Sequence, residues 1–383
     1  MSISIRLFFS LMLMLWVTPA LAENSYEVVT WAPRHGPSAI WFDAFGGISS
    51  SVNMFNANGG PGGRQVKLNR LDLAENDSAF LPSLAAGMER PGVIAAIGGS
   101  SLVKGPEIAE YMRRANYPWL GPWSNQMSIY QGTESDPFAV LPGWDLEIAA
   151  LLKYAAVFYK AEAVKRGSVA FVYHDLPDTR EMAEFAAKKA QSEGLVLKTM
   201  PIPAGFSSWA DLAARAQGID VWLIWLDPGT SAALAKAIKT RRPEALLLTS
   251  SLNATNRNLV AVSGGAWNGV VFPAVVRPSA SIDKAYADLL RKYGPVGLDD
   301  SYQAYLGFAQ GQILAQALNS GSVATGLDLR RALYGIKGLR TLLWAPVTYS
   351  ADQKSGNEHF YLGRAVGDGK WEPAIGQKLD WQE

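Results

Sequence analysis

Residues 26–63 read YEVVTWAPRHGPSAIWFDAFGGISSSVNMFNANGGPGG, and this stretch decides the fold. Tyr26–Ala32 has the length and apolar content of a buried β-strand. From Trp41 to Phe55, apolar residues then recur at intervals of four, three, four and three, which predicts a helix with one face against a sheet. The glycine-rich residues 58–63 end that helix, because glycine accepts the left-handed backbone of a helix cap.

The same alternation of short apolar runs and longer amphipathic runs continues along the chain. A strand-helix-strand rhythm of this kind is typical of a parallel sheet with helices on both faces. The next strands are predicted at Gln65–Leu73, Val93–Ile97 and Pro118–Leu120, with helices at Ser78–Met88 and Lys104–Arg114.

Residues 121–143 are rich in Pro, Gly, Ser and Asn, and we interpret them as a loop that leaves this first lobe. Beyond them the rhythm resumes, so the chain has a second lobe, as its 383 residues suggest. Its predicted helices are Trp144–Tyr159, Asp178–Glu193, Trp209–Ala216 and Ser231–Thr240, and its strands are Ser168–Tyr173, Val196–Met200, Val221–Leu226, Ala245–Thr249 and Gly269–Val275. Further helices follow at Ile282–Tyr293, Tyr302–Asn319 and Leu327–Tyr334, then antiparallel strands at Thr348–Tyr349, His359–Val366 and Lys370–Pro373.

Residues 1–22 have the features of a secretory signal peptide. Arg6 precedes an apolar run from Leu7 to Val17, and Ala20-Leu21-Ala22 has the small-x-small pattern of a cleavage site. The apolar run is shorter than the roughly 20 residues that a membrane-spanning helix needs. We therefore expect cleavage after Ala22 and a periplasmic protein without direct membrane insertion.

The composition excludes several classes of function. The formal net charge of +1 falls to zero once residues 1–22 are removed, so no basic field indicates a nucleic-acid partner. The absence of Cys excludes disulfides, Cys nucleophiles and iron–sulfur sites, and three His leave little for a metal centre. We expect neither a metal nor a cofactor. The 13 Trp are the unusual feature and require an explanation.

An ordered set of short motifs runs along the mature chain. They are APRHGPSAIW at 32–41, NANGG at 56–60 with GR at 63–64, AIG at 96–98, GP at 121–122, YHD at 173–175 and the closing pair of strands around 360–371. In this order and at this spacing, the chain resembles the type I periplasmic substrate-binding proteins of ABC transporters, the family that binds branched-chain amino acids and amides. The pattern also resembles a subfamily associated with PQQ-dependent alcohol dehydrogenase systems.

The resemblance implies an α/β fold of two αβα lobes, each with a mostly parallel sheet, joined by three crossover strands. The first lobe would contain residues 23–143 and 276–345, and the second 144–275 and 346–383. A ligand cleft would lie between the lobes and close by a hinge movement. The resemblance further implies a monomer that delivers a small molecule to a permease in the inner membrane.

The family's ligand positions transfer to particular residues of this chain. Trp41 matches an aromatic position that packs on the ligand, although it equally suits the first core position of its helix. Asp227 and at least one of Ser100 and Ser101 also have an alternative role as helix caps. The residues that we predict for the ligand site are Trp41, Ser100, Ser101, Trp123, Ser124, Asn125, Tyr173, His174, Asp227, Ser251 and Asn253.

Two positions depart from the pattern of the amino-acid binders. Leu102 stands where they carry the Ser that holds the α-carboxylate, and Ser251 stands near the Glu that receives the α-ammonium. A buried ammonium without such partners costs several kcal/mol. We therefore expect a small neutral or acidic organic ligand, an alcohol-derived or aromatic compound, with Trp225 as a further aromatic group beside the site.

Four other interpretations apply to parts of this sequence. An enzyme is disfavoured, because no G-x-S-x-G motif occurs and the adjacent His174 and Asp175 point to opposite faces of a strand. Calcium sites at 298–301 or 352–358 lack EF-hand spacing, and a helix N-cap at 299–301 is the simpler explanation. A periplasmic sensor that feeds a signalling partner, and a genuine branched-chain amino-acid binder, remain alternatives.

Overall fold

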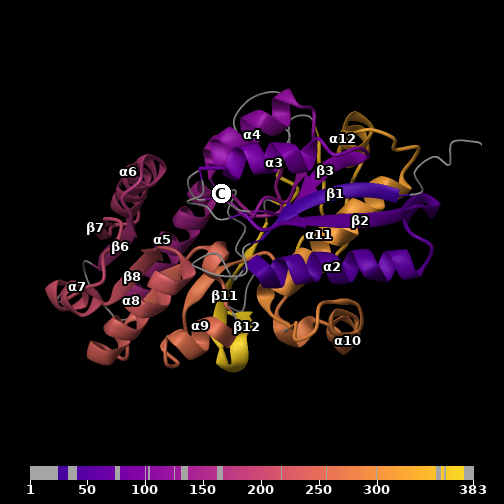
Figure 1. The fold of residues 1–383 in the computed structure, drawn as a ribbon. Helices are drawn as coiled ribbons and strands as arrows, with labels where there is room; N and C mark the ends of the chain where they lie inside the picture. The colour runs from indigo at the N-terminus through magenta and orange to yellow at the C-terminus, as the bar shows by residue number, and fades with distance from the viewer. Residues whose placement is uncertain are drawn as a thin grey trace, which may run out of the picture.

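The computed structural model describes residues 25–32, 41–73, 78–99, 101, 104–124, 126–130, 137–161, 167–216, 218–255, 257–298, 300–350, 355–357 and 359–374. The predicted signal peptide lies outside them. Two separate sheets organise these residues, as Figure 1 shows. The α/β fold with two mostly parallel sheets is confirmed.

The first sheet has five parallel strands in the order β2-β1-β3-β4-β5. Side chains of β1 alternate between two cores: Tyr26 and Val28 pack in one, and Val29 and Trp31 in the other. The sheet is therefore covered on both faces. Its strands are β1 (Ser25–Trp31), β2 (Gln65–Leu71), β3 (Val93–Ile97), β4 (Trp119–Leu120) and β5 (Pro137–Phe138).

The helices of this half divide between the two faces. The core that contains Val29 and Trp31 also contains residues of α3 (Phe80–Met88) and α4 (Gly105–Arg114). On the other face, α2 (Trp41–Ala57) lies beside α11 (Tyr302–Asn319), and Figure 1 shows the two running together. The remaining helices of this half are α10 (Lys284–Tyr293) and α12 (Gly326–Tyr334), with short 3-10 turns at Pro61–Gly63 and Met127–Ile129.

The second sheet has seven strands in the order β12-β11-β10-β9-β8-β6-β7. It is parallel from β10 to β7, and β11 is antiparallel to both β10 and β12. The strands are β6 (Ser168–His174), β7 (Val196–Ile202), β8 (Val221–Trp225), β9 (Leu246–Thr249), β10 (Val271–Ala274), β11 (Tyr361–Val366) and β12 (Lys370–Pro373). The helices are α5 (Trp144–Ala161), α6 (Pro177–Ser192), α7 (Trp209–Arg215), α8 (Pro228–Arg241) and α9 (Arg257–Val262), with 3-10 turns at Ser251–Asn253, Ser279–Ser281 and Gly367–Gly369.

The chain passes between the two sheets three times. Residues 139–143 lead from β5 to α5, residues 275–278 lead from β10 back toward α10, and the chain between α12 and β11 makes the third passage. We call these the connecting segments. They lie against one another, because Ala139 is bridged to Ser355 and Val276 to Leu343.

Three details of the predicted secondary structure are wrong. Residues 121–143 were expected to be a loop, but Pro137–Phe138 pairs with β4 as an edge strand, a position that tolerates proline. The six-residue α9 was not expected. Thr348–Tyr349 is not a strand: Tyr349 is fully buried, packs edge-on against Phe138 and donates its hydroxyl to Ala139 O over 3.0 Å. Two-residue strands and single-turn helices are too short to have a periodic pattern.

Helix α11 is an unusually apolar element, and 15 of its 18 residues are buried. Even so, no helix among the described ranges combines the length and the hydropathy that crossing a bilayer requires.

The contact between α2 and α11 depends on glycine. A Cβ at Gly47 would collide with the backbone of Ala304, and one at Gly307 with the carbonyl of Ala44. One turn further along, a Cβ at Gly311 would collide with the side chain of Ser51. The two helices therefore run in parallel at backbone-to-backbone distance, with both N-terminal ends at the same edge of the first sheet.

We expect Gly307→Ala to lower the free energy of unfolding by about 1–3 kcal/mol, because the added methyl group forces the two backbones apart. Urea unfolding followed by tryptophan fluorescence measures this. Gly321→Ala is the matched control, since an added Cβ there has no atom within 4 Å. Equal midpoints for Gly307→Ala and the unmodified protein would contradict the packing argument.

Candidate ligand-binding site

The order of the strands places a crevice in each half of the molecule. After β1 the chain moves to β2 at one side and then returns to β3 at the other, so the carboxyl ends of β1 and β3 flank a topological switch point. In the second sheet, β6 and β8 have the same relation, with β7 outside. In open α/β sheets such points are where ligands bind. The connecting segments leave from the carboxyl ends of β5 and β10, which places both switch points at the edges that these segments join.

Two tryptophans stack near the first switch point. Trp41 begins α2 and Trp123 follows β4, and their rings lie 5.3 Å apart with an angle of 5° between the planes. They are 5% and 2% exposed. Trp123 donates its indole N–H to Gln310 Oε1 over 3.1 Å, and Gln310 donates to Gly121 O over 2.9 Å. The pair belongs to the packed core, so any ligand contact uses a ring face or edge, and that contact stays a prediction.

Gln303 is a residue that sequence analysis missed. It lies in the first turn of α11 and is 0% exposed, yet neither its Oε1 nor its Nε2 has a hydrogen-bond partner among the described residues. Because Ala44 lies opposite Gly307, Gln303 and Trp41 lie at the same end of the helix pair, one turn back from that contact. A buried amide left unpaired costs about 1–3 kcal/mol for each group.

The neighbours of Gln303 anchor this turn on both sides. Ser301 caps α11 by accepting from Ala304 N over 3.1 Å, and its hydroxyl donates to Asp43 Oδ2 over 3.0 Å. Tyr302 accepts a 3.0 Å hydrogen bond at its hydroxyl from Val275 N, in a connecting segment. Gln303 is thus held where the first lobe meets the second. The sequence does contain a signal for Gln303. It lies seven residues before Gln310 in a largely apolar helix, and this spacing of two turns puts both amides on one face.

Two of the serines predicted for the ligand site, Ser101 and Ser124, accept hydrogen bonds from backbone N–H groups within turns. Ser101 Oγ accepts from Lys104 N over 2.8 Å in the turn before α4, but Lys104 is the N-cap residue of that helix, so Ser101 does not cap it. Ser124 Oγ accepts from Gln126 N over 3.2 Å, and Ser124 O accepts from the Tyr130 hydroxyl over 2.8 Å. Both serines are buried. Ser100 and Asn125 lie outside the described residues, as does Leu102.

His174 and Asp227 connect the two strands at the second switch point. His174 ends β6, Asp227 follows β8, and the His174 Nε2 to Asp227 Oδ2 distance is 3.0 Å. Asp227 also caps α8, because its Oδ1 accepts from Thr230 N over 3.1 Å. Burial raises the pKa of Asp227, but hydrogen bonds from His174 and Thr230 outweigh burial and hold that pKa below its ordinary value.

Tyr173, Trp225 and Asn253 lie on the elements that carry His174 and Asp227 or contact those elements. Tyr173 and Trp225 are paired neighbours in β6 and β8, and both are largely buried. Asn253 donates to Leu226 O over 2.6 Å and to Ser231 Oγ over 3.1 Å, which ties the turn after β9 to the start of α8. Their contact with a ligand stays a prediction.

Ser251 is bound by a carboxylate that the sequence did not place there. Glu147, in the first turn of α5, is fully buried and accepts from Ser251 N over 3.2 Å and from the Ser251 hydroxyl. Each oxygen of Glu147 therefore accepts one hydrogen bond from Ser251. Burial raises the pKa of Tyr302, and the charge of Glu147 raises it further.

The described residues contain no group of three or more His, Asp or Glu placed to hold a metal ion. Aromatic faces, amides and capped helix starts gather near the two switch points, and groups of this kind are typical of sites for small organic molecules.

The comparisons with known proteins agree with this geometry. Residues 27–370 match the family described as periplasmic binding proteins. The chain belongs to the periplasmic binding protein family. A search of curated proteins found no match to this periplasmic binding protein by sequence.

Solved structures resemble this periplasmic binding protein closely in fold. A branched-chain amino-acid ABC transporter protein from Thermus thermophilus with bound valine is 17% identical, with 94% of this chain and 98% of that one covered and a TM-score of 0.79. A fatty acid ABC transporter substrate-binding protein from Thermomonospora curvata is 15% identical, with 93% of each chain covered and a TM-score of 0.79. A solute-binding protein from R. palustris in complex with benzoate is 16% identical, with 91% and 95% covered and a TM-score of 0.76.

We expect Asp227→Asn to lower the free energy of unfolding by about 1–2 kcal/mol at pH 6, because it removes the charge that His174 and Thr230 stabilise. The pKa of this carboxyl is lower in the folded than in the unfolded protein, so its stabilising effect exists above pH 3.8 and is lost as the pH falls through the folded pKa. Urea unfolding of both proteins between pH 3 and 7 measures the difference.

The exposed Asp211, in the first turn of α7, provides the control. Asp211→Asn should change stability little across the same range. A constant gap between Asp227→Asn and the unmodified protein down to the lowest pH would contradict the role assigned to the charge of Asp227.

Proposed function

We propose that this periplasmic binding protein is the solute-binding component of an ABC importer. In this proposal residues 1–22 direct export and are removed, and the mature protein binds a small neutral or acidic organic molecule between its two sheets. Hinge closure then removes the ligand from water, and the closed form docks on a permease in the inner membrane. The solute-binding role itself follows from the family.

The observation that carries the proposal is the buried amide of Gln303, which has no partner among the described residues and lies at the same end of the α2–α11 pair as Trp41. An amide offers two N–H donors and a carbonyl acceptor. A carboxamide or hydroxyl group on the ligand satisfies both sides of it, a carboxylate satisfies its N–H donors, and indole rings at this end of the helix pair suit an apolar or aromatic body. The proteins with bound valine and benzoate, and the fatty acid transporter protein, indicate that this fold accepts such chemically different ligands.

The polar groups of the second lobe support a ligand without an ammonium group. Ser251 occupies the region where the resemblance implies an ammonium-binding Glu, and the nearby Glu147 already accepts two hydrogen bonds from Ser251. Asp227 is engaged by His174 and Thr230. Both carboxylates therefore already have hydrogen-bond donors within the protein, and neither needs an ammonium group on the ligand to avoid being left unpaired.

We expect leucine, isoleucine and valine to leave the melting temperature unchanged at concentrations at which a cognate acid, amide or alcohol raises it. The protein is first unfolded and refolded to remove any co-purified ligand, and the released material is identified by mass spectrometry. A clear shift with a branched-chain amino acid would overturn the proposed ligand class and favour the amino-acid alternative. Stimulation of a permease ATPase, rather than of a signalling partner, separates transport from sensing.

We expect Gln303→Leu to weaken binding of the identified ligand by about tenfold or more, because one or two hydrogen bonds to a buried amide are lost. The ligand-free variant should be as stable as the unmodified protein, since an unpaired buried amide is replaced by an apolar group of similar size. Calorimetric titration and thermal melting measure the two effects.

Gln316→Leu on the exposed face of the same helix is the control and should bind normally. If Gln303→Leu binds as tightly as the unmodified protein, Gln303 does not contact the ligand. If the ligand-free variant is strongly destabilised, the amide has a structural role instead.

A further inference from the structure

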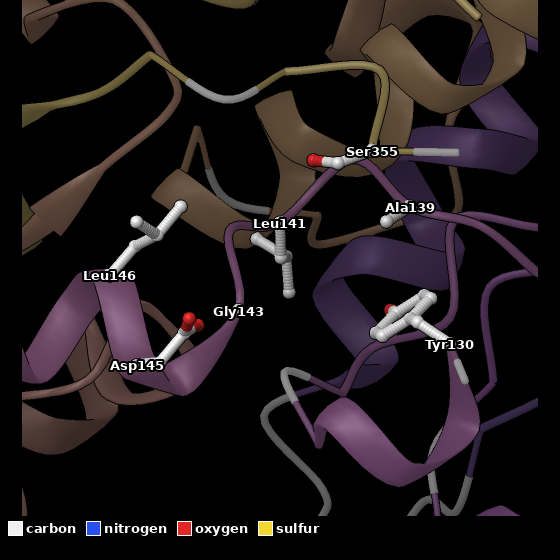
Figure 2. A pocket seen from close by; sticks show the side chains of 7 residues that line it. All are labelled: Tyr130, Ala139, Leu141, Gly143, Asp145, Leu146 and Ser355. Carbon is white, nitrogen blue, oxygen red and sulfur yellow. The ribbon is translucent and has the colours of Figure 1, made fainter. Parts of the chain in front are cut away.

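A cavity lies beside the connecting segments. Its volume is about 200 Å³, and Figure 2 shows the residues around it. The lining residues are Tyr130, Ala139, Leu141, Gly143, Asp145, Leu146 and Ser355. None of them is among the residues that we predicted for the ligand site.

The walls of this cavity come from both halves of the molecule. Tyr130 lies in the chain between β4 and β5, whereas Asp145 and Leu146 lie in the first turn of α5, which belongs to the second sheet. Leu141 lies between them in a connecting segment, as Figure 2 shows. Ser355 reaches the cavity from another connecting segment, through the bridge between Ala139 and Ser355. A hinge movement that separates the sheets changes the distance between these walls.

Most of the side chains that line this cavity are apolar, and one of them, Asp145, carries a carboxylate. Asp145 Oδ1 is shielded from solvent and has no hydrogen-bond partner among the described residues. An Asp in the first turn of a helix is stabilised by the helix dipole, but that role leaves the carboxylate in water or bound to a backbone N–H. Asp145 Oδ1 is in neither situation, so this oxygen is an acceptor without a donor.

Ser355 also leaves an acceptor available in the cavity. Ser355 Oγ donates to Asn357 O over 3.4 Å, which leaves its lone pairs for a donor. Tyr130 uses its hydroxyl hydrogen on Ser124 O over 2.8 Å. The cavity thus offers a carboxylate and a hydroxyl oxygen to a donor, beside the side chains of Leu141 and Leu146. This combination suits a cationic head on a short apolar body.

We propose that this cavity is a second small-molecule site, which takes a primary alkylamine with its ammonium on Asp145 and its alkyl body against Leu141 and Leu146. An apolar cavity of about 150 Å³ holds benzene, so 200 Å³ accommodates a body of this size. The site is separate from the cleft ligand, for which an uncharged or acidic molecule is proposed. Because its walls belong to both halves, an amine that fits one hinge state better than the other shifts the hinge equilibrium.

The test uses 3-methylbutylamine with the mature protein, in ligand-detected NMR and calorimetric titration. We expect saturable binding of the amine. The alcohol 3-methylbutan-1-ol and the acid 3-methylbutanoate have the same alkyl body without the positive charge and should bind at least about tenfold more weakly, since a charge-assisted hydrogen bond contributes about 1.5–3 kcal/mol. Equal binding of amine and alcohol would overturn the role of Asp145.

Two variants locate the site. Asp145→Asn removes the charge with little change of shape and should weaken amine binding by about tenfold, whereas Leu146→Trp fills the cavity and should abolish it. Asp211→Asn, an exposed Asp in the first turn of α7, controls for a general loss of negative charge and should bind the amine normally. Thermal melting verifies that each variant is folded.

The variants Asp145→Asn and Gln303→Leu distinguish a failure of the amine site from a failure of the proposed cleft site. Asp145→Asn should keep its affinity for the cleft ligand, and Gln303→Leu should keep its affinity for the amine. No saturable amine binding by the unmodified protein, or undiminished binding by a folded Asp145→Asn, overturns the proposal. Loss of amine binding in Gln303→Leu would place the amine in the cleft and would overturn it equally.

Discussion

The backbone contact between α2 and α11 is the constraint on which the first half of the molecule depends. Gly47, Gly307 and Gly311 remove the side chains that would hold the two helices apart. Because the helices run in parallel, this contact brings the start of α11 to the start of α2, at the carboxyl edge of the sheet. Helix α11 is separated from α2 by more than 240 residues, and its first turn nevertheless completes the crevice that α2 begins.

That position explains why a polar residue is buried in such an apolar helix. Gln310 has a structural task, since it binds both Trp123 and the Gly121 carbonyl. Gln303, two turns earlier, has the same orientation on the helix and no protein partner among the described residues. The tryptophans of the composition are likewise accounted for in part: Trp31, Trp119, Trp123, Trp222, Trp267 and Trp371 are among the largest fully buried side chains. Most of them fill cores, and the Trp41–Trp123 stack is the pair that lies beside the candidate site.

The second half uses polar links where the first uses aromatic packing. Asp227 both caps α8 and binds His174 across the gap between β6 and β8, so one carboxylate fixes a helix start and joins two strand ends. Glu147 joins the first turn of α5 to the turn after β9, because it accepts hydrogen bonds from Ser251. These links give both carboxylates hydrogen-bond donors, whereas Asp145, two residues before Glu147 on α5, lines a separate cavity with an oxygen that has no donor among the described residues. The difference in partners, rather than in residue type, separates the two sites chemically.

By itself the sequence determined the fold class, because the change from strand-length apolar runs to stripes of helical period depends only on local spacing. It also placed most of the strands of both sheets to within a few residues, and it brought Trp41, Trp123, His174 and Asp227 to strand ends and helix starts. It did not find β5 or α9, which are too short to have a period. Only the tertiary structure decided which partners each polar group has. Glu147 meets Ser251 and Trp123 meets Gln310 from more than 100 residues away, and Gln303 and Asp145 meet no donor or acceptor in the described chain. Pairing of this kind depends on how distant helices pack, and no local pattern in the chain encodes it.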